Sequence, residues 1–335
     1  MKAVAYCHSL PIDDPQSLLD LELPDPVPQG RDLRVRVHAV SVNPVDTKVR
    51  RNTAPPAGQA KVLGWDAAGI VDAVGPEVTL FRPGDRVMYA GDITRAGSNS
   101  ELQLVDERIV GPMPATLGFA EAAALPLTAI TAWELLFERL GVDERTEGAL
   151  LIVGAAGGVG SMVTQLARQL TRLTVVGTAS RPETSAWVRE LGAHHVIDHR
   201  QPLAEALRAT GLAGVTHVAS LTQTEQHYAQ LIEALLPQGK LALIDDPAQP
   251  LDARPLKRKS LSLHWELMFT RSMFATPDLQ AQHELLKQVA GLIDAGRLRS
   301  TLGEHFGQIN AAHLRRAHAY IESGKARGKA VLEGF

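Results

Sequence analysis

The residues of this chain best suited to chemistry lie in the stretch 154–161, GAAGGVGS. It reads A-x-G-x-x-G on Ala155, Gly157 and Gly160, with Gly158 and Val159 inside the motif. Glycines allow a tight turn after a strand and let backbone N–H groups approach a pyrophosphate where a helix begins. The motif therefore predicts dinucleotide binding; the alternative is a tight strand-to-helix turn that holds no ligand.

The end of the next apolar run indicates which dinucleotide binds. NAD sites usually carry an Asp or Glu there, which bonds the ribose 2′-hydroxyl. This chain instead reads Thr178, Ala179, Ser180 and Arg181. Without a carboxylate, and with paired donors on Arg181, the site favours a 2′-phosphate and hence NADPH over NADH. The alternative is an arginine on a solvated turn. Thr178, Ser180 and Arg181 are thus cofactor-binding candidates.

The elements around this motif alternate between helical patterns and short apolar runs. Alternation of this kind predicts βαβ units and a Rossmann-type, doubly wound parallel sheet, an α/β fold. The expected helices are 128–140, 160–171, 182–191 and 223–236, and the expected strands are 149–153, 173–178, 194–198, 215–221 and 240–245.

The first ~125 residues are predicted to be mostly β, forming a small barrel or curled sheet. Short alternating stretches separated by turn residues carry this prediction, at 33–42, 69–75, 84–91 and 101–110. A chain of 335 residues is too long for one ordinary core, so at least two domains are expected. We expect domains at 1–125 and 126–270, with a C-terminal segment at 271–335.

Composition narrows the class of protein. The chain is 45% hydrophobic and 21% charged with a net charge of −3, which disfavours a nucleic-acid or membrane surface as partner. The N-terminus lacks the sustained apolar region of a secretory signal, and Cys7 is the single cysteine. One cysteine excludes a disulfide framework and a cysteine-based structural zinc site. A cytoplasmic protein is expected.

Several motifs together resemble the medium-chain dehydrogenase/reductase superfamily: NPVD (43–46), GWDAAGIVDAVG (64–75), PGDRV (83–87), PLTAITAWELL (126–136) and GAAGGVGS. The likeness is strongest to the zinc-independent quinone oxidoreductase branch, which includes zeta-crystallin. The stretch LHWELMFTRSMF (263–274) resembles a subgroup often labelled zinc-type alcohol dehydrogenase-like. The resemblance implies a GroES-like catalytic domain, an NADPH-binding Rossmann domain, and a terminal segment that returns to the catalytic domain.

The chain departs from the zinc-dependent members of this superfamily. Those members carry Cys where Asn43 stands, and Gly-His-Glu where this chain has Gly64, Trp65 and Asp66. A catalytic zinc needs about three N, S or O ligands from the protein, and neither an indole nor an amide serves well. We therefore expect no zinc. Two groups of histidines are considered as other metal sites. His194, His195 and His199 cluster at the third expected strand and are interpreted as a polar strand edge, and His313 and His318 lie on a late helix.

The resemblance also suggests roles in catalysis. It places Asn43 beside the nicotinamide and the substrate carbonyl, where its N–H would donate to the oxygen that becomes negative. Asp46 is expected to fix the loop. Lys48 either points inward and stabilises or protonates an enolate, or is a solvated charge. Tyr89 is a catalytic candidate and is also expected to form part of the pocket wall.

Further cofactor contacts are implied by the same resemblance. Thr131 matches a position at the nicotinamide end, although it could equally be a helix residue that faces a sheet. His199 stands where the family often has Tyr near the adenosine. Lys329, in the basic cluster with Lys325 and Arg327, lies in the segment that returns toward the cofactor.

An apolar, aromatic pocket would suit a flat quinone or enone. Its expected walls are Trp65, Tyr89, Phe269, Met273 and Phe274, each of which could also be ordinary core.

We therefore expect an NADPH-dependent, zinc-free enzyme that transfers hydride to a quinone or to an α,β-unsaturated carbonyl. No Tyr has a Lys four residues later, which disfavours a short-chain reductase. No G-x-S-x-G elbow exists, which disfavours a Ser-His-Asp hydrolase. The alternatives are a weakly active NADPH-binding sensor or structural protein and, less favoured, a zinc alcohol dehydrogenase. The alternating segment 260–266 resembles an edge strand, and the family suggests a homodimer formed through it.

Overall fold

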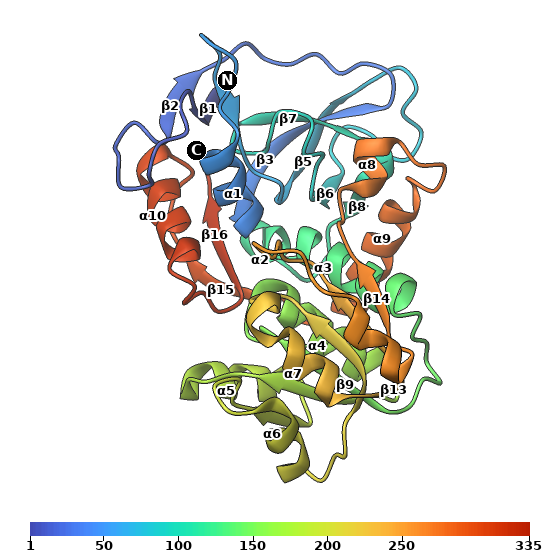
Figure 1. Cartoon of the computed structure of the whole chain (residues 1–335). Coiled ribbons are helices and arrows are strands. Elements are labelled where there is room, and N and C mark those ends of the chain that lie inside the picture. Colours follow the sequence, from blue (N-terminus) through green and yellow to red (C-terminus); the bar gives the residue numbers. More distant parts are fainter. The chain divides into compact units, whose positions relative to one another are not determined.

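The computed structural model describes residues 1–335, which divide into two compact units (Figure 1). The β-rich unit contains residues 1–130 together with residues 269–335, so the C-terminal segment joins the N-terminal part of the chain. The parallel-sheet unit contains residues 131–268.

The parallel-sheet unit is built on six parallel strands in the order β11-β10-β9-β12-β13-β14. Numbered along the unit, this is the 3-2-1-4-5-6 order of a Rossmann fold, with the first strand beside the point where the order reverses. The expected doubly wound α/β fold is confirmed. The strands are β9 (Ala149–Val153), β10 (Thr174–Thr178), β11 (His195–Ile197), β12 (Val215–Ser220), β13 (Leu235–Leu243) and β14 (Ser262–Trp265). The helices are α4 (Gly158–Leu170), α5 (Pro182–Glu190), α6 (Leu203–Ala209) and α7 (Thr224–Ala234), with 3-10 helix η3 (Arg254–Lys259).

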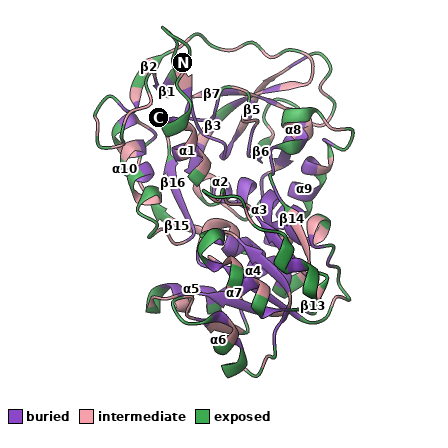
Figure 2. Ribbon diagram, viewed as in Figure 1, coloured by how far each residue is buried: buried purple, intermediate pink, exposed green.

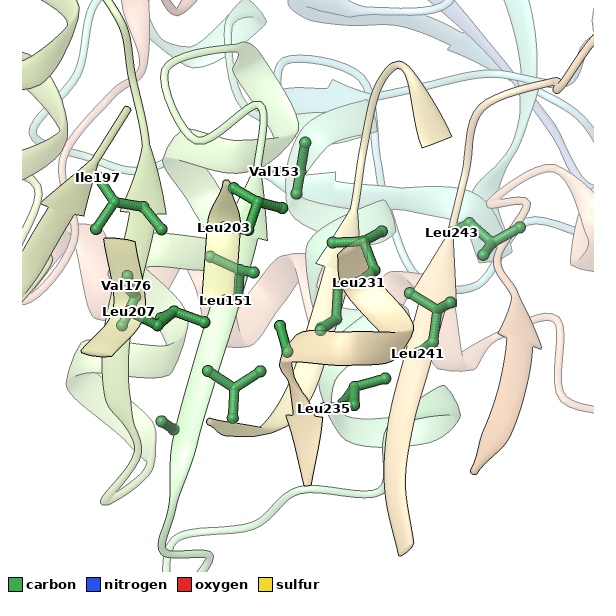
Figure 3. Close-up of a cluster of buried hydrophobic side chains, with 14 residues drawn as sticks. Leu151, Val153, Val176, Ile197, Leu203, Leu207, Leu231, Leu235, Leu241 and Leu243 are labelled. Carbon is green, nitrogen blue, oxygen red and sulfur yellow. The ribbon is translucent and has the colours of Figure 1, made fainter. Parts of the chain in front are cut away.

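Aliphatic side chains between this sheet and its helices make the core of the unit. Every residue of β9 is buried, as expected for a central strand covered on both faces. Figure 3 shows Leu151 of β9 among leucines from the neighbouring strands and helices, such as Leu207 and Leu241. Burial of this apolar surface holds the carboxyl ends of the strands in fixed positions.

The β-rich unit contains a seven-stranded mixed sheet and a three-stranded antiparallel sheet. In the larger sheet the order is β15-β16-β3-β5-β6-β8, and β7 also pairs with β3. The smaller sheet has the order β2-β1-β4. The strands are β1 (Lys2–Tyr6), β2 (Leu19–Glu22), β3 (Asp32–Val42), β4 (Lys61–Val62), β5 (Ala67–Val74), β6 (Arg86–Tyr89), β7 (Leu102–Asp106), β8 (Val110–Pro112), β15 (Leu302–His305) and β16 (Lys329–Glu333).

Helices cover parts of these sheets. Helix α9 packs against β8, and α10 packs against α1 and β16. Figure 2 shows that the inner strands are largely buried while outward helix faces are exposed. The helices of this unit are α1 (Pro44–Asn52), α2 (Phe119–Ala123), α8 (Thr270–Phe274), α9 (Ala281–Asp294) and α10 (Ala311–Glu322). Helix α3 (Pro126–Trp133) begins in this unit and ends in the parallel-sheet unit, where it continues into a π-helical turn, η2 (Glu134–Arg139).

One expected strand is broken. The pattern at 101–110 predicts a single strand, but β7 and β8 are separated by the 3-10 turn η1 (Glu107–Ile109). The carboxylate of Glu107 is buried and accepts hydrogen bonds from the backbone N–H groups of Thr79 and Leu80, while Arg31 pairs with it. These distant partners fix the turn, and alternation along the chain cannot reveal them.

The continuous helical stretch Phe119–Arg139 is long and apolar enough to cross a bilayer by length and composition. About four fifths of its apolar window is buried in the structure, 78%. A buried core helix passes the same test of hydropathy, so this stretch is weak evidence for a membrane span.

Candidate active site

The glycine loop in the parallel-sheet unit has the geometry that a pyrophosphate requires. A Cβ on Gly160 would lie 2.3 Å from the carbonyl oxygen of Gly154, so the strand end and the helix approach too closely for any side chain. Gly154 has a φ of +82°, which also favours glycine. Gly157 caps α4, and the first N–H groups of the helix, on Gly158 and Val159, have no partner within the helix. The loop therefore fits a dinucleotide pyrophosphate.

The residues predicted to contact the ribose and its phosphate lie at the ends of β10 and β11. Thr178 is buried and its hydroxyl accepts a hydrogen bond from the N–H of Gly154 (3.1 Å), so it supports the glycine loop. Arg181 lies at the N-terminus of α5, 40% exposed, with Nε 3.2 Å from Glu183. His199 makes an edge contact with the ring of His227, their centroids 6.1 Å apart.

One residue near this edge was missed in the sequence. Arg200 donates from Nη2 to the carbonyl oxygen of Ser180 (3.2 Å) and also pairs with Asp198. The sequence shows Arg200 only as a charge after a strand, because its contact with the neighbouring strand end depends on sheet order. Thr131, the other predicted contact, is buried in α3.

The β-rich unit holds the second group of predicted residues, centred on Asn43. The amide Nδ2 of Asn43 donates to Asp66 (2.8 Å), and its Oδ1 accepts a hydrogen bond from Lys329. Lys329 also contacts Asp66 directly, with Nζ 2.9 Å from Oδ2. Asn43, Asp66 and Lys329 are all at least 97% buried. We refer to these three residues as the amide cluster.

Asp66 is the acceptor at the centre of the amide cluster. Besides Asn43 and Lys329, it accepts hydrogen bonds from the hydroxyl of Ser41 (2.9 Å) and the backbone N–H of Leu127 (2.7 Å). The sequence identified Asp66 only as a replacement for a zinc-enzyme glutamate. Its position within GWDAAG was the available signal. Lys329 was predicted as a cofactor contact, and the structure places its ammonium on Asn43 and Asp66.

Asp46 holds the backbone of Asn43. Its carboxylate accepts a hydrogen bond from the N–H of Asn43 (2.7 Å) and caps the N-terminus of α1, confirming the structural role expected for it. Burial raises the pKa of Asp46 to about 7; the N–H of Asn43 and the charge of Lys329 offset part of this rise. The site therefore contains a carboxyl that titrates near neutral pH.

The predicted pocket residues divide into two sets. Trp65 and Phe269 are buried and meet edge to face, with ring centroids 6.1 Å apart. Tyr89 is also buried, its hydroxyl donates to Gln103 (2.8 Å), and burial raises its pKa. Met273 and Phe274 are 40% and 71% exposed. Three of the five predicted wall residues are therefore buried, and the two on α8 are exposed.

Lys48 is half-buried on α1. Its helix begins directly after Asn43, so both residues belong to one rigid element.

The positions that hold zinc in related enzymes have other contacts here. The indole N–H of Trp65 donates to the carbonyl oxygen of Asp92 (3.2 Å), and both ends of the Asn43 amide are engaged in the amide cluster. His194 accepts a backbone hydrogen bond from Val175 (2.9 Å). No group of three or more His, Cys, Asp or Glu side chains in residues 1–335 is arranged to hold a metal ion.

Comparison with known proteins agrees with this architecture. Residues 29–132 match the alcohol dehydrogenase GroES-like domain and residues 191–332 match a zinc-binding dehydrogenase family. A zinc-type alcohol dehydrogenase-like protein from Staphylococcus aureus is 37% identical over 99% of both chains. A quinone oxidoreductase from Pseudomonas aeruginosa is 32% identical over 91% of this chain and 92% of its own.

Solved structures show the same likeness. A protein from Rhizobium etli described as a zinc-dependent alcohol dehydrogenase is 59% identical, covers 100% of this chain and 98% of its own, and has a TM-score of 0.97. Mycobacterial Rv1454c complexed with NADPH is 26% identical, covers 99% and 100% of the two chains, and has a TM-score of 0.85.

A Rossmann unit with a pyrophosphate loop, together with a GroES-like unit, defines a dehydrogenase or reductase of the alcohol dehydrogenase type. The chain belongs to the medium-chain dehydrogenase/reductase superfamily of oxidoreductases. The resemblance in the sequence is confirmed.

Proposed function

We propose that this protein is an NADPH-dependent, zinc-free reductase of quinones or of the activated double bond of α,β-unsaturated carbonyls. The observation that carries the proposal is the amide cluster, in which Asn43 occupies a position where zinc enzymes have a ligand and is bonded at both ends. The quinone oxidoreductase from P. aeruginosa and the NADPH complex of Rv1454c support the reaction class and the cofactor.

NADPH supplies the hydride when it is bound. The residues of the glycine loop would hold its pyrophosphate with backbone N–H groups, assisted by the positive end of the α4 dipole. Arg181 would bind the 2′-phosphate with paired guanidinium donors, because its ion pair with Glu183 is exposed and therefore weak.

Asn43 stabilises the negative charge that develops on the acceptor oxygen. The amide Nδ2 of Asn43 donates to Asp66 at 2.8 Å and to the carbonyl oxygen of Ser41 at 3.5 Å. The long contact with Ser41 is the weaker of the two, so this second N–H is the one that would turn to the acceptor. Lys329 bonds Oδ1 and therefore fixes which end of the amide carries the donors. The ammonium also draws electron density toward Oδ1, which makes the remaining N–H a stronger donor. This preorganised donor replaces the Lewis acid of the zinc enzymes.

Turnover assays that combine each cofactor with each type of acceptor test the proposal. Oxidation of NADPH and of NADH would be followed by absorbance with a quinone and with an enone, before and after dialysis against a chelator. We expect turnover with NADPH, no loss on chelation, and a fall in kcat of about 100-fold in Asn43→Ala, as for other oxyanion donors. Asn52→Ala, at the exposed far end of the same helix, is the matched control and should keep its activity.

Other outcomes would point elsewhere. Activity that disappears on chelation and returns with zinc would support a zinc alcohol dehydrogenase. Binding of NADPH without turnover of either acceptor would support a sensor or structural role. Unchanged kcat in a folded Asn43→Ala protein would remove Asn43 from the mechanism, with folding checked by thermal melting.

We also propose that the protein is a cytoplasmic homodimer joined through β14. This strand is the edge of the six-stranded sheet, so one side of its backbone lacks a partner strand. Trp265 at its end and Leu267 just beyond are each 53% exposed. Sedimentation should show a dimer that Trp265→Lys converts to monomer, whereas Val27→Lys, at another exposed apolar residue, should not. A monomeric wild-type protein would contradict this proposal.

A further inference from the structure

We propose that Arg200 is a second ligand for the 2′-phosphate of NADPH, and that Arg200 and Arg181 together select NADPH over NADH. This inference rests on the proposed use of NADPH and adds a specificity-determining residue to that site. It depends on how the guanidinium of Arg200 is held between two neighbouring strand ends.

Sheet pairing brings Arg200 to the end of β10. Strands β10 and β11 pair up to Thr178 and Ile197, and the N–H of Ala179 continues the ladder by donating to Ile197 (3.0 Å). Arg200 follows β11 and donates to the carbonyl oxygen of Ser180 (3.2 Å). Its guanidinium is therefore anchored at the residue that directly precedes Arg181.

Asp198 fixes the orientation of this guanidinium. Nε of Arg200 lies 3.0 Å from both carboxylate oxygens of Asp198, and Nη2 lies 2.6 Å from Oδ2. Arginine has five N–H donors, and these bonds use those on Nε and Nη2. The two donors on Nη1 have no partner in the protein and can bind two phosphate oxygens, as guanidinium groups do in bidentate pairs.

The exposure of the pair allows a phosphate to reach it. The side chain of Arg200 is 66% exposed and that of Asp198 is 29% exposed, while Arg181 and Glu183 are 40% and 56% exposed. Exposed ion pairs are weak, so neither carboxylate holds its arginine strongly against a dianion. Two guanidinium groups one strand apart then provide more donors than either arginine could alone.

The chain offers a closely matched control. Arg254 pairs with Asp252 through Nε at 2.8 and 3.0 Å and Nη2 at 2.7 Å, which repeats the Asp198–Arg200 arrangement on η3 of the same unit. Its side chain is 90% exposed. A substitution of Arg254 removes the same kind of ion pair and the same charge as a substitution of Arg200. It leaves the donors at the end of β10 in place.

Equilibrium binding, with no acceptor present, tests the inference. NADPH and NADH would be titrated separately into the wild-type protein and the variants Arg200→Ala, Arg200→Lys, Arg181→Ala and Arg254→Ala. Trp187, whose indole N–H donates to Ser161 in the first turn of α4 (2.9 Å), provides a fluorescence signal next to the loop. Calorimetry gives an independent Kd.

We expect Arg200→Ala to raise the Kd for NADPH about tenfold and to leave that for NADH within about twofold. Arg200→Lys should fall between, because a lysine keeps the charge and loses the bidentate geometry. Arg254→Ala should bind both cofactors as the wild type does.

Two results would overturn the inference, and they are distinguishable. If Arg181→Ala abolishes the preference for NADPH while Arg200→Ala retains it, then Arg200 is not a ligand and the proposed cofactor stands. If the wild-type protein binds NADH as tightly as NADPH, both the role of Arg200 and the proposed cofactor are wrong.

Discussion

Replacing Lys329 with methionine isolates the contribution of the amide cluster to stability. The substitution keeps an unbranched side chain of similar length and removes the ammonium that contacts Asp66 at 2.9 Å. Lys329 is 3% exposed and Asp66 is fully buried, so water cannot solvate the carboxylate that remains. Removing one partner of a buried ion pair costs about 3–5 kcal/mol. That loss is a large part of the roughly 5–15 kcal/mol by which domains are stable.

Urea unfolding of single and double variants measures this cost. Lys329→Met should lower the free energy of unfolding of the β-rich unit by about 3–5 kcal/mol. The double variant Lys329→Met/Asp66→Asn buries no net charge at this position. Its loss in free energy of unfolding should therefore be smaller than the sum of the losses in the two single variants. Arg254→Met, which breaks the exposed pair with Asp252, should cause no measurable change.

Two results would refute this reasoning. A loss below about 1 kcal/mol in Lys329→Met would mean that the buried carboxylate of Asp66 does not depend on the ammonium for its stabilisation. Strictly additive single and double losses would mean that Lys329 and Asp66 do not stabilise each other.

Three further predictions concern titration and the glycine loop. Because the pKa of Asp46 is raised from 3.8 to about 7, stability should fall as pH rises between these values, by up to about 4 kcal/mol, and Asp46→Asn should remove the fall. Burial lowers the pKa of His318 from 6.5 to about 3, so stability should instead be lost as pH falls below 6.5, by about 2 kcal/mol at pH 5; His318→Leu should remove that loss. Gly160→Ala should weaken NADPH binding at least tenfold, since its Cβ would lie 2.3 Å from a backbone oxygen. The control is Gly291→Ala in α9, where an added Cβ would meet nothing within 4 Å; this substitution should raise the free energy of unfolding by about 0.5–1 kcal/mol.

Each of these predictions has a measurement that can contradict it. Unfolding free energies recorded from pH 4 to pH 8 should show opposite slopes for the contributions of Asp46 and His318; parallel profiles for a variant and the wild type would remove that residue from the account. For the loop, NADPH titration of Gly160→Ala with wild-type affinity would show that the strand and the helix can separate without cost.

Local sequence was sufficient for the nucleotide loop. The apolar run at 149–153, the glycines and the amphipathic segment that follows are adjacent in the chain, and each specifies its own conformation. Helix α1 was not predicted, although Pro44 at its first position and Asp46 as a cap are local signals for it. That error was one of interpretation, because the information was present in the sequence.

The position of Arg181 was similarly readable, since it directly follows β10 and begins α5. The position of Arg200 could not be predicted in this way, because the spacing of residues along the chain does not reveal the order of strands in a sheet. Only the pairing of β10 with β11 shows that Arg200 reaches Ser180.

The sequence by itself determined the fold class, the dinucleotide loop and the absence of a zinc-ligand pattern at residues 43, 65 and 66. Tertiary structure alone decided what contacts Asn43. Strand β16 pairs antiparallel with β3, and the register that places Ala330 opposite Val42 brings Lys329 beside Asn43. These residues are 286 positions apart, and Lys329 and Asp66 are 263 apart. Hydrogen bonds between strands fix such a register only when the sheet forms, so no local pattern could have revealed the amide cluster.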